Sequence, residues 1–372
     1  MLSAHEMISK KMTQQGGTRM KAADLAISLP TDNEKIKPDI VWLDVRKPPF
    51  QLHGLYNPQK EIPFRRVPEA VAKATSEGVA FLATHPAGGR ARFRTDSHYI
   101  AVRCTCARGT PSPNVTLLAQ SGFDLYRFDG ERDTYAASLQ PPPAGTPFYE
   151  SVADMPGVMS DYMLCLPLLD AVSELYIGLQ ADATIETARP YRDLPPVVYY
   201  GSSITQGIGA SRPGNSYEAM ISRRFHLDFI NLGFSGSARG ETAIVEYLSS
   251  LTMSAFVCDY DHNAPDVAYL QATHLSLYKH FRSVQKDVPV IFVSKPDFEN
   301  DAFAPQRRQV IRDTYAYAKA HGDEQVYFID GETLFGTDGR DACTVDRCHP
   351  NDLGFYRMAC VIGDKLQQVL HL

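Results

Sequence analysis

The stretch Val197-Val198-Tyr199-Tyr200-Gly201-Ser202-Ser203-Ile204-Thr205-Gln206-Gly207 begins as a run of β-branched and aromatic residues and changes at Gly201, where two serines and a polar segment follow. Such a pattern is typical of a buried parallel strand that ends in a tight turn and opens a helix. In open α/β sheets, ligands bind just beyond the carboxyl ends of such strands. A serine here is therefore a candidate nucleophile, although the stretch alone does not choose between Ser202 and Ser203.

Strand-like and helix-like segments alternate from this stretch to the end of the chain. Strands are predicted at 197–200, 228–232, 255–260, 288–293 and 326–329, and helices at 216–225, 241–249, 267–284, 305–320 and 353–370. Alternation of this kind favours a parallel five-stranded sheet with helices on both faces. We therefore expect a three-layer α/β sandwich of the flavodoxin-like type, with strand order 2-1-3-4-5.

The preceding part of the chain has a different sequence pattern, in which short apolar runs are separated by Gly/Pro turns. Strands are predicted there at 80–84, 91–95, 99–106, 115–120, 124–128, 134–138, 162–166 and 175–179. Many short strands at short intervals favour an all-β sandwich or jelly roll. Pro195 and Pro196 stiffen the junction between the two parts. The predicted organisation is a leader over 1–35, disordered or partly helical, a β domain over 36–190 and an α/β domain over 191–372.

Composition excludes several classes of protein. The 372 residues are 44% hydrophobic and 22% charged, with a net charge of −6, so they lack the basic footprint of a nucleic-acid-binding protein. No apolar run approaches the roughly 18 residues of a membrane span, and the polar first 20 residues do not resemble a secretory signal. We interpret the seven cysteines as free thiols of a cytoplasmic protein. We expect no metal and no organic cofactor, and leave homo-oligomerisation open.

Three later loops could supply partners for the serine. The loop after the second strand contains Gly236, and glycines there free backbone N–H groups to face an oxyanion. The loop after the third strand contains Asn263, whose amide can donate to a developing negative charge. Before the last helix, Asp346 and His349 lie three residues apart. In a turn, that carboxylate can hold one imidazole nitrogen and leave the other free to take a proton from a serine.

Other residues near the predicted strand ends allow alternative interpretations. Asp261 and His262 could form a metal site or a second acid/base pair, but we favour loop residues that shape the cleft. A set of aromatic residues could stack on a sugar, although most such residues belong to a core: Tyr199, Tyr200, Tyr217, Phe234 and Tyr260. The β domain shows no catalytic cluster, and its role is either to pack or to form a wall of the substrate cleft.

The four loops together resemble the SGNH (GDSL) hydrolase superfamily, in the order Ser203, Gly236, Asn263 and Asp346-x-x-His349. The resemblance covers about residues 195–370. In the first part, residues 121–126 (Ser-Gly-Phe-Asp-Leu-Tyr) look like the Gly-x-Asp-Leu-Tyr signature of a β domain that precedes one SGNH branch. Three departures exist: Ser202 stands where the family usually has aspartate, Arg347 where it often has glycine, and the residues around Asn263 differ.

The resemblance implies a serine esterase that works through an acyl-enzyme. Ser203 would be the nucleophile, His349 the base and Asp346 the residue that orients it. The oxyanion hole would consist of the N–H groups of Ser203 and Gly236 and the amide of Asn263. The implied substrate is a small-molecule or oligosaccharide ester, with an O-acetyl group on a carbohydrate as first choice. Three alternatives stay open: an acyltransferase to a sugar hydroxyl, a lipase or short-chain esterase on other substrates, and a non-catalytic sugar-binding module.

Overall fold

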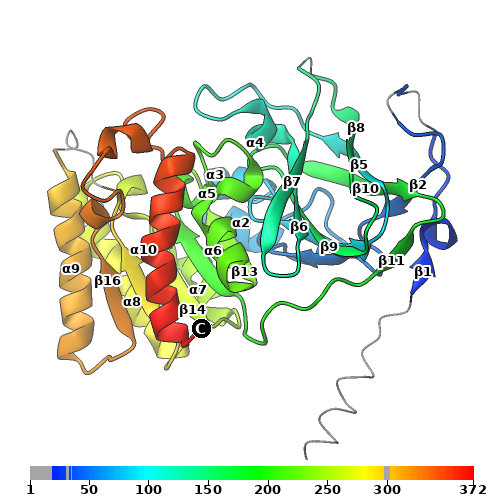
Figure 1. Cartoon of the computed structure of the whole chain (residues 1–372). Helices are drawn as coiled ribbons and strands as arrows, with labels where there is room; N and C mark the ends of the chain where they lie inside the picture. The colour runs from blue at the N-terminus through cyan, green and yellow to red at the C-terminus, as the bar shows by residue number, and fades with distance from the viewer. Residues whose placement is uncertain (1–18, 31–32, 35, 144, 297–301) are drawn as a thin grey trace, which may run out of the picture.

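The computed structural model describes residues 19–30, 33–34, 36–143, 145–296 and 302–372. Over these ranges the chain forms a β-sheet part and an α/β part that lie side by side (Figure 1). None of the helices in these ranges has the length and apolar character that would let it cross a membrane.

The first part is a sandwich of two antiparallel sheets, as predicted. One sheet has the order β1-β11-β4-β9-β6-β7 with β3 paired to β4, and the other has the order β2-β10-β5-β8. Inward-facing apolar side chains of both sheets form one core between them. The strands are Met20–Lys21 (β1), Ile40–Asp44 (β2), Gln51–His53 (β3), Arg90–Thr95 (β4), Tyr99–Cys106 (β5), Phe123–Phe128 (β6), Asp133–Leu139 (β7), Phe148–Asp154 (β8), Ser160–Cys165 (β9), Val172–Gln180 (β10) and Thr184–Glu186 (β11).

Two of the strands predicted in this part are wrong, because both segments fall in short helices that begin with a capping side chain. The run 80–84 falls largely in helix α3 (Glu77–Leu82), and the run 115–120 falls in helix α4 (Leu117–Ser121). Ser76 and Thr116 accept hydrogen bonds from the first turns of these helices. A short apolar run does not distinguish a buried helix from a strand, and here the capping side chains decide.

The second part contains the predicted parallel sheet, with the order β13-β12-β14-β15-β16, which is 2-1-3-4-5 in chain order. Its strands are Val197–Gly201 (β12), Phe229–Gly233 (β13), Ala255–Asp259 (β14), Val290–Val293 (β15) and Val326–Ile329 (β16). Because Gly201 is level with Gly233 on one side and with Asp259 on the other, the three central strands end abreast. The loops that follow them therefore start from one edge.

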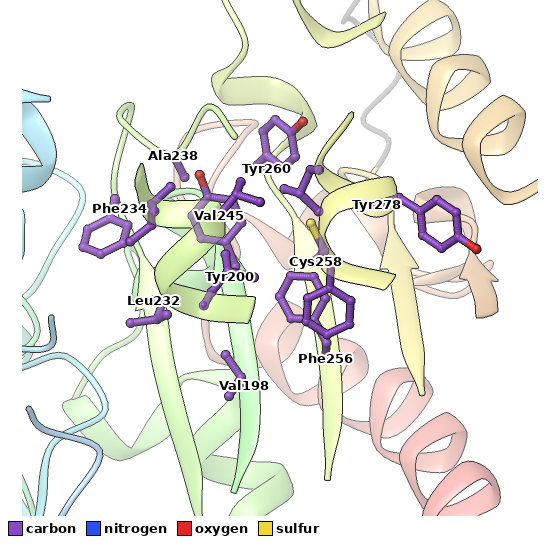
Figure 2. Close-up of a cluster of buried hydrophobic side chains, with 14 of the residues drawn as sticks. Val198, Tyr200, Leu232, Phe234, Ala238, Val245, Phe256, Cys258, Tyr260 and Tyr278 are labelled. Atoms are coloured by element: carbon purple, nitrogen blue, oxygen red, sulfur yellow. The ribbon is translucent and has the colours of Figure 1, made fainter. Parts of the chain in front are cut away.

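Helices cover both faces of this sheet. Side chains of α7 (Thr242–Ser250), α8 (Val267–Val284) and α9 (Ala304–Ala320) share one apolar core with the sheet, part of which is drawn in Figure 2. Side chains of α6 (Tyr217–Phe225) and α10 (Asp352–Leu370) share the core on the opposite face. This is the expected three-layer sandwich. The remaining helices are α2 (Glu69–Thr75), α5 (Ser203–Gln206) and five 3₁₀ turns: Ala22–Leu25, Pro213–Asn215, Asp261–Asn263, Gly331–Thr333 and Arg340–Cys343.

Residues of the first part enter both cores of the α/β part. Val67 and Val79, near helices α2 and α3, pack in the core of Figure 2, and Ala119 and Leu168 pack in the core of the opposite face. Within the predicted leader, strand β1 pairs with β11, and residues 1–18 lie outside the described ranges. The two parts are therefore joined by continuous apolar packing as well as by the chain.

Candidate active site

Ser203 lies just beyond strand β12, where a tight turn at Ser202 opens helix α5. Ser202 is fully buried, and its hydroxyl caps α5 by accepting a hydrogen bond from the N–H of Ile204 at 3.1 Å. Ser203 is the first residue of α5, so its own N–H has no acceptor within the helix. Gly201 is required in this turn, because a Cβ added there would lie 1.8 Å from Oδ1 of Asp259. The structure thus gives Ser202 a capping role and leaves the hydroxyl of Ser203 available.

His349 and Asp346 approach Ser203 from the loop that precedes α10. Nε2 of His349 lies 2.9 Å from Oγ of Ser203, and Nδ1 lies 2.7 Å from Oδ2 of Asp346. The other carboxylate oxygen accepts the backbone N–H groups of Cys348 and His349 at 3.0 and 2.7 Å. Burial raises the pKa of the Asp346 carboxyl, but the hydrogen bonds from His349 outweigh it and hold the pKa below its usual value. The carboxylate is therefore kept ionised beside the imidazole.

The loop after β13 brings Gly236 toward the same edge. Gly236 has φ +67°, and a Cβ added there would meet no atom within 4 Å, so its surroundings are open. The loop is tied to the nucleophile turn, because the N–H of Phe234 donates to the carbonyl of Gly201 at 2.8 Å and that of Ser235 donates to Oε1 of Gln206 at 2.9 Å. Among the described residues, the N–H groups of Ser203 and Gly236 have no hydrogen-bond acceptor. Both donors are thus free to bind an anion.

Asn263 joins this group through the same loop. Its Nδ2 donates to the carbonyl of Phe234 at 3.0 Å, which uses one amide hydrogen and leaves the other. Arg307 of α9 holds the Asn263 segment by donating to the carbonyls of Asp261 and Ala264 at 2.6 and 2.8 Å. The amide of Asn263 is therefore fixed against the Gly236 loop.

Asp261 and His262 form a local pair. The carboxylate of Asp261 is buried, accepts the N–H of Lys295 at 3.1 Å and lies 3.1 Å from Nδ1 of His262. Burial raises the pKa of Asp261, but the hydrogen bond and charge of His262, together with the backbone N–H groups of Lys295 and His262, outweigh it and lower the pKa overall. Among the described residues, no group of three or more His, Cys, Asp or Glu side chains has the arrangement of a metal site. This pair shapes the loop that carries Asn263.

The aromatic residues proposed for sugar stacking are not available for that role. All five are at most 1% exposed: Tyr199, Tyr200, Tyr217, Phe234 and Tyr260. Figure 2 shows Tyr200, Phe234 and Tyr260 within the core of one face of the sheet. The interpretation that they stack on a sugar is wrong, because all five side chains are packed in the two apolar cores between the sheet and its helices.

Three polar residues that contact these loops are absent from the sequence-based site. Asp259 ends β14 beneath the nucleophile turn, where its Oδ1 accepts the N–H of Ser202 at 3.3 Å. Arg66 of the first part donates to the carbonyl of Gly233 at 2.6 Å. Asn114, also of the first part, donates to Oδ2 of Asp346 at 2.5 Å. Only Asp259 had a local signal, its place at a strand end, because the other two are far from the site in sequence.

Two family models match the chain, one over each of its two parts. The sequence model of the GDSL-like lipase/acylhydrolase family matches residues 195–370, and that of the N-terminus of SGNH-hydrolase-type esterases, named GxDLY, matches residues 40–185. A search of curated proteins gives no match.

Solved structures resemble the chain over both parts. A protein of Bacteroides ovatus described as a GDSL-like lipase is 29% identical, with a TM-score of 0.81, over 89% of this chain and 98% of that one. The salicylyl-acyltransferase SsfX3 of a tetracycline biosynthetic pathway is 20% identical, with a TM-score of 0.74, over 90% and 98%. An acetyl xylan esterase of the rumen bacterium Butyrivibrio proteoclasticus is 12% identical, with a TM-score of 0.57, over 95% and 99%. At such identities the last two likenesses concern the fold alone.

Proposed function

The chain belongs to the SGNH (GDSL) hydrolase superfamily, in the branch with an N-terminal GxDLY domain, and is a carboxylic ester hydrolase. On that basis we propose that it cleaves short O-acyl esters, above all O-acetyl groups on carbohydrate. We propose that the reaction uses a Ser-His-Asp acyl-enzyme mechanism. The observation that carries the mechanism is the line of contacts from Ser203 through His349 to Asp346, at 2.9 and 2.7 Å. These distances are the hydrogen-bond reach that a nucleophile and its base require.

In the proposed first step, Oγ of Ser203 attacks the ester carbonyl while Nε2 of His349 takes the hydroxyl proton. The tetrahedral intermediate collapses when the bond to the alcohol breaks, and His349 returns the proton to the departing alkoxide. Water then attacks the acyl-enzyme in the same way, so that the acid leaves and Ser203 regains its proton. Asp346 holds the imidazole in the tautomer with the proton on Nδ1 and stabilises the imidazolium without accepting the proton itself.

The oxyanion of each tetrahedral intermediate would be held by the N–H groups of Ser203 and Gly236 and by the amide of Asn263. The support for this role is that both N–H groups lack an acceptor among the described residues and that Asn263 uses only one amide hydrogen on Phe234. Fixed donors stabilise charge that develops during the reaction without reorganising, and each is typically worth about 10²–10³ in rate.

The substrate class is supported by fold likeness. The neighbours include an acetyl xylan esterase and an acyltransferase, which share the fold but have little sequence identity with this chain. We favour hydrolysis of a carbohydrate acetate, because carbohydrate esterases recur among these neighbours. We also place the protein in a reducing compartment such as the cytoplasm, because all seven cysteines are free.

The test is an assay of wild type and Ser203→Ala on p-nitrophenyl esters of graded chain length and on acetylated xylo- and gluco-oligosaccharides. We expect turnover to fall with chain length, acetate to be released from the oligosaccharides, and Ser203→Ala to lose at least about 10³ of kcat. Wild-type turnover by Ser203→Ala would overturn the nucleophile. A preference for long acyl chains would overturn the substrate class. Transfer to an added sugar in preference to water would replace hydrolysis by acyl transfer.

A further inference from the structure

We propose that Asn114 of the N-terminal β domain is a positioning residue of the catalytic triad, whose side-chain amide fixes the Asp346 carboxylate against His349. The inference rests on the proposed function and extends it: the first domain would complete the catalytic site as well as pack against it. Asn114 lies in the loop between β5 and α4, both labelled in Figure 1, and this loop contacts the α/β part through Asn114 and Thr116.

The amide of Asn114 contacts the carboxylate oxygen of Asp346 that also holds the imidazole of His349. Nδ2 of Asn114 lies 2.5 Å from Oδ2 of Asp346, the same oxygen that lies 2.7 Å from Nδ1 of His349. The other oxygen, Oδ1, is already occupied by two backbone N–H groups of its own turn. With Asn114 in place, both carboxylate oxygens accept two hydrogen bonds. The plane of the carboxylate is then set from both domains.

The loop that carries Asn114 is itself anchored to the α/β domain. The hydroxyl of Thr116 donates to the carbonyl of Ser211 at 2.6 Å and also caps α4. Asn114 and Thr116 line a surface cavity of about 560 Å³ together with residues that flank the Asp346 loop. The nearby carboxylate of Asp352 is bound by Ser211 and Asn215 instead. The amide of Asn114 is therefore directed to Asp346.

This geometry assigns Asn114 a chemical effect. A carboxylate that loses a hydrogen bond can rotate, and its alignment with Nδ1 of His349 is no longer fixed. Hydrogen bonds to a charged group are stronger than those between neutral groups. Loss of the bond from Asn114 to the Asp346 carboxylate should therefore raise the energy of the transition state, in which the imidazole becomes a cation. We expect Asn114→Ala to lower kcat by about 10- to 100-fold, with KM changed by less than about threefold.

Thr116→Val is the matched control, because it removes the anchor and the helix cap of the same loop without touching the triad. We expect it to lower the melting temperature at least as much as Asn114→Ala does, with kcat within about threefold of wild type. Asn114→Asp gives a second readout. It places two carboxyl groups at hydrogen-bond distance, which share one proton at low pH and repel each other once both ionise. Its kcat relative to wild type should therefore decline as the pH rises from 5 to 9, whereas the ratio for Asn114→Ala should stay level.

The decisive experiment measures kcat, KM, melting temperature and the pH profile for these three variants beside Ser203→Ala, on p-nitrophenyl acetate. An active Ser203→Ala would overturn the proposed function and this inference with it. If Ser203→Ala is inactive, a kcat of Asn114→Ala within threefold of wild type overturns the positioning role alone. Equal losses of kcat in Asn114→Ala and Thr116→Val, without the pH-dependent decline in Asn114→Asp, would overturn it too, because the loop would then act only through folding.

Discussion

Arg66 should be one of the most stability-critical side chains of this protein. It belongs to the β domain, yet its guanidinium is buried, 1% exposed, at the carboxyl end of strand β13. Its partners are oxygens on both parts of the chain: the carbonyls of Leu82, His85, Asn231 and Gly233 and the side-chain oxygen of Asn231, at 2.6–3.3 Å. All five of these acceptors are uncharged oxygens. The side chain thus joins two domains by satisfying backbone acceptors.

The magnitude for Arg66→Met follows from what the substitution leaves behind. Methionine fills a similar length but donates nothing, so four carbonyls and one amide oxygen lose a partner. A buried acceptor left with no partner at all costs about 1–3 kcal/mol. Oδ1 of Asn231 and the carbonyl of Leu82 would still accept the N–H groups of Gly233 and His85, at 2.8 and 3.1 Å, so their loss costs less. Removing a buried charge also relieves a desolvation penalty of several kcal/mol, which offsets part of that sum. We expect the free energy of unfolding to fall by about 3–5 kcal/mol, in the range measured when one member of a buried polar network is removed.

The assay is thermal and urea unfolding of purified wild type and variants, followed by circular dichroism. Arg65→Ala is the control, because Arg65 is the adjacent residue and forms ion pairs with the partly exposed Glu61 and Glu69, at 3.3 and 3.6 Å. We expect the control to lose no more than about 1 kcal/mol. We also expect kcat of Arg66→Met to fall, because the carbonyl of Gly233 leads into the loop that carries Gly236. Equal stabilities of Arg66→Met and Arg65→Ala would refute the reasoning.

Three other predictions follow from single contacts. Asp346→Asn should lower kcat by about 10⁴-fold without unfolding the protein, because an amide hydrogen on Nδ1 of His349 would select the wrong tautomer; a steady-state rate within tenfold of wild type would contradict this. Asn263→Ala should cost about 10²–10³ in kcat, with a smaller change in KM, as single-turnover acylation kinetics can show; an unchanged acylation rate would remove it from the oxyanion hole. Burial raises the pKa of Asp259 to about 8, so the folded state binds a proton that the unfolded chain releases near pH 4, and this carboxyl lowers stability as the pH rises from 4 to 8. Asp259→Asn should flatten that fall in melting temperature, and a parallel pH dependence in wild type and variant would show that another group is responsible.

Much of the α/β domain can be predicted from sequence because its signals are local. Helix α8 and strand β16 occupy the predicted ranges, since periodicity and flanking turns are properties of short windows. The strand order 2-1-3-4-5 is expected from the flavodoxin-like class, and the structure confirms it. The predictions at α3 and α4 are wrong because these segments are short. Their secondary structure depends on packing against the other domain and on a single capping side chain.

For the site, the sequence by itself determined the candidate groups: a serine after the first strand, a glycine and an asparagine after the next two, and an Asp-x-x-His turn before the last helix. Tertiary structure alone decided how they are used. It buried the hydroxyl of Ser202 as a cap and placed Ser203 2.9 Å from His349. It also brought Arg66 and Asn114 from the other domain onto the carbonyl of Gly233 and onto Asp346. The physical reason is range: a strand, a turn or a cap depends on neighbours in the chain, whereas a hydrogen bond across 232 residues exists only after both domains have packed.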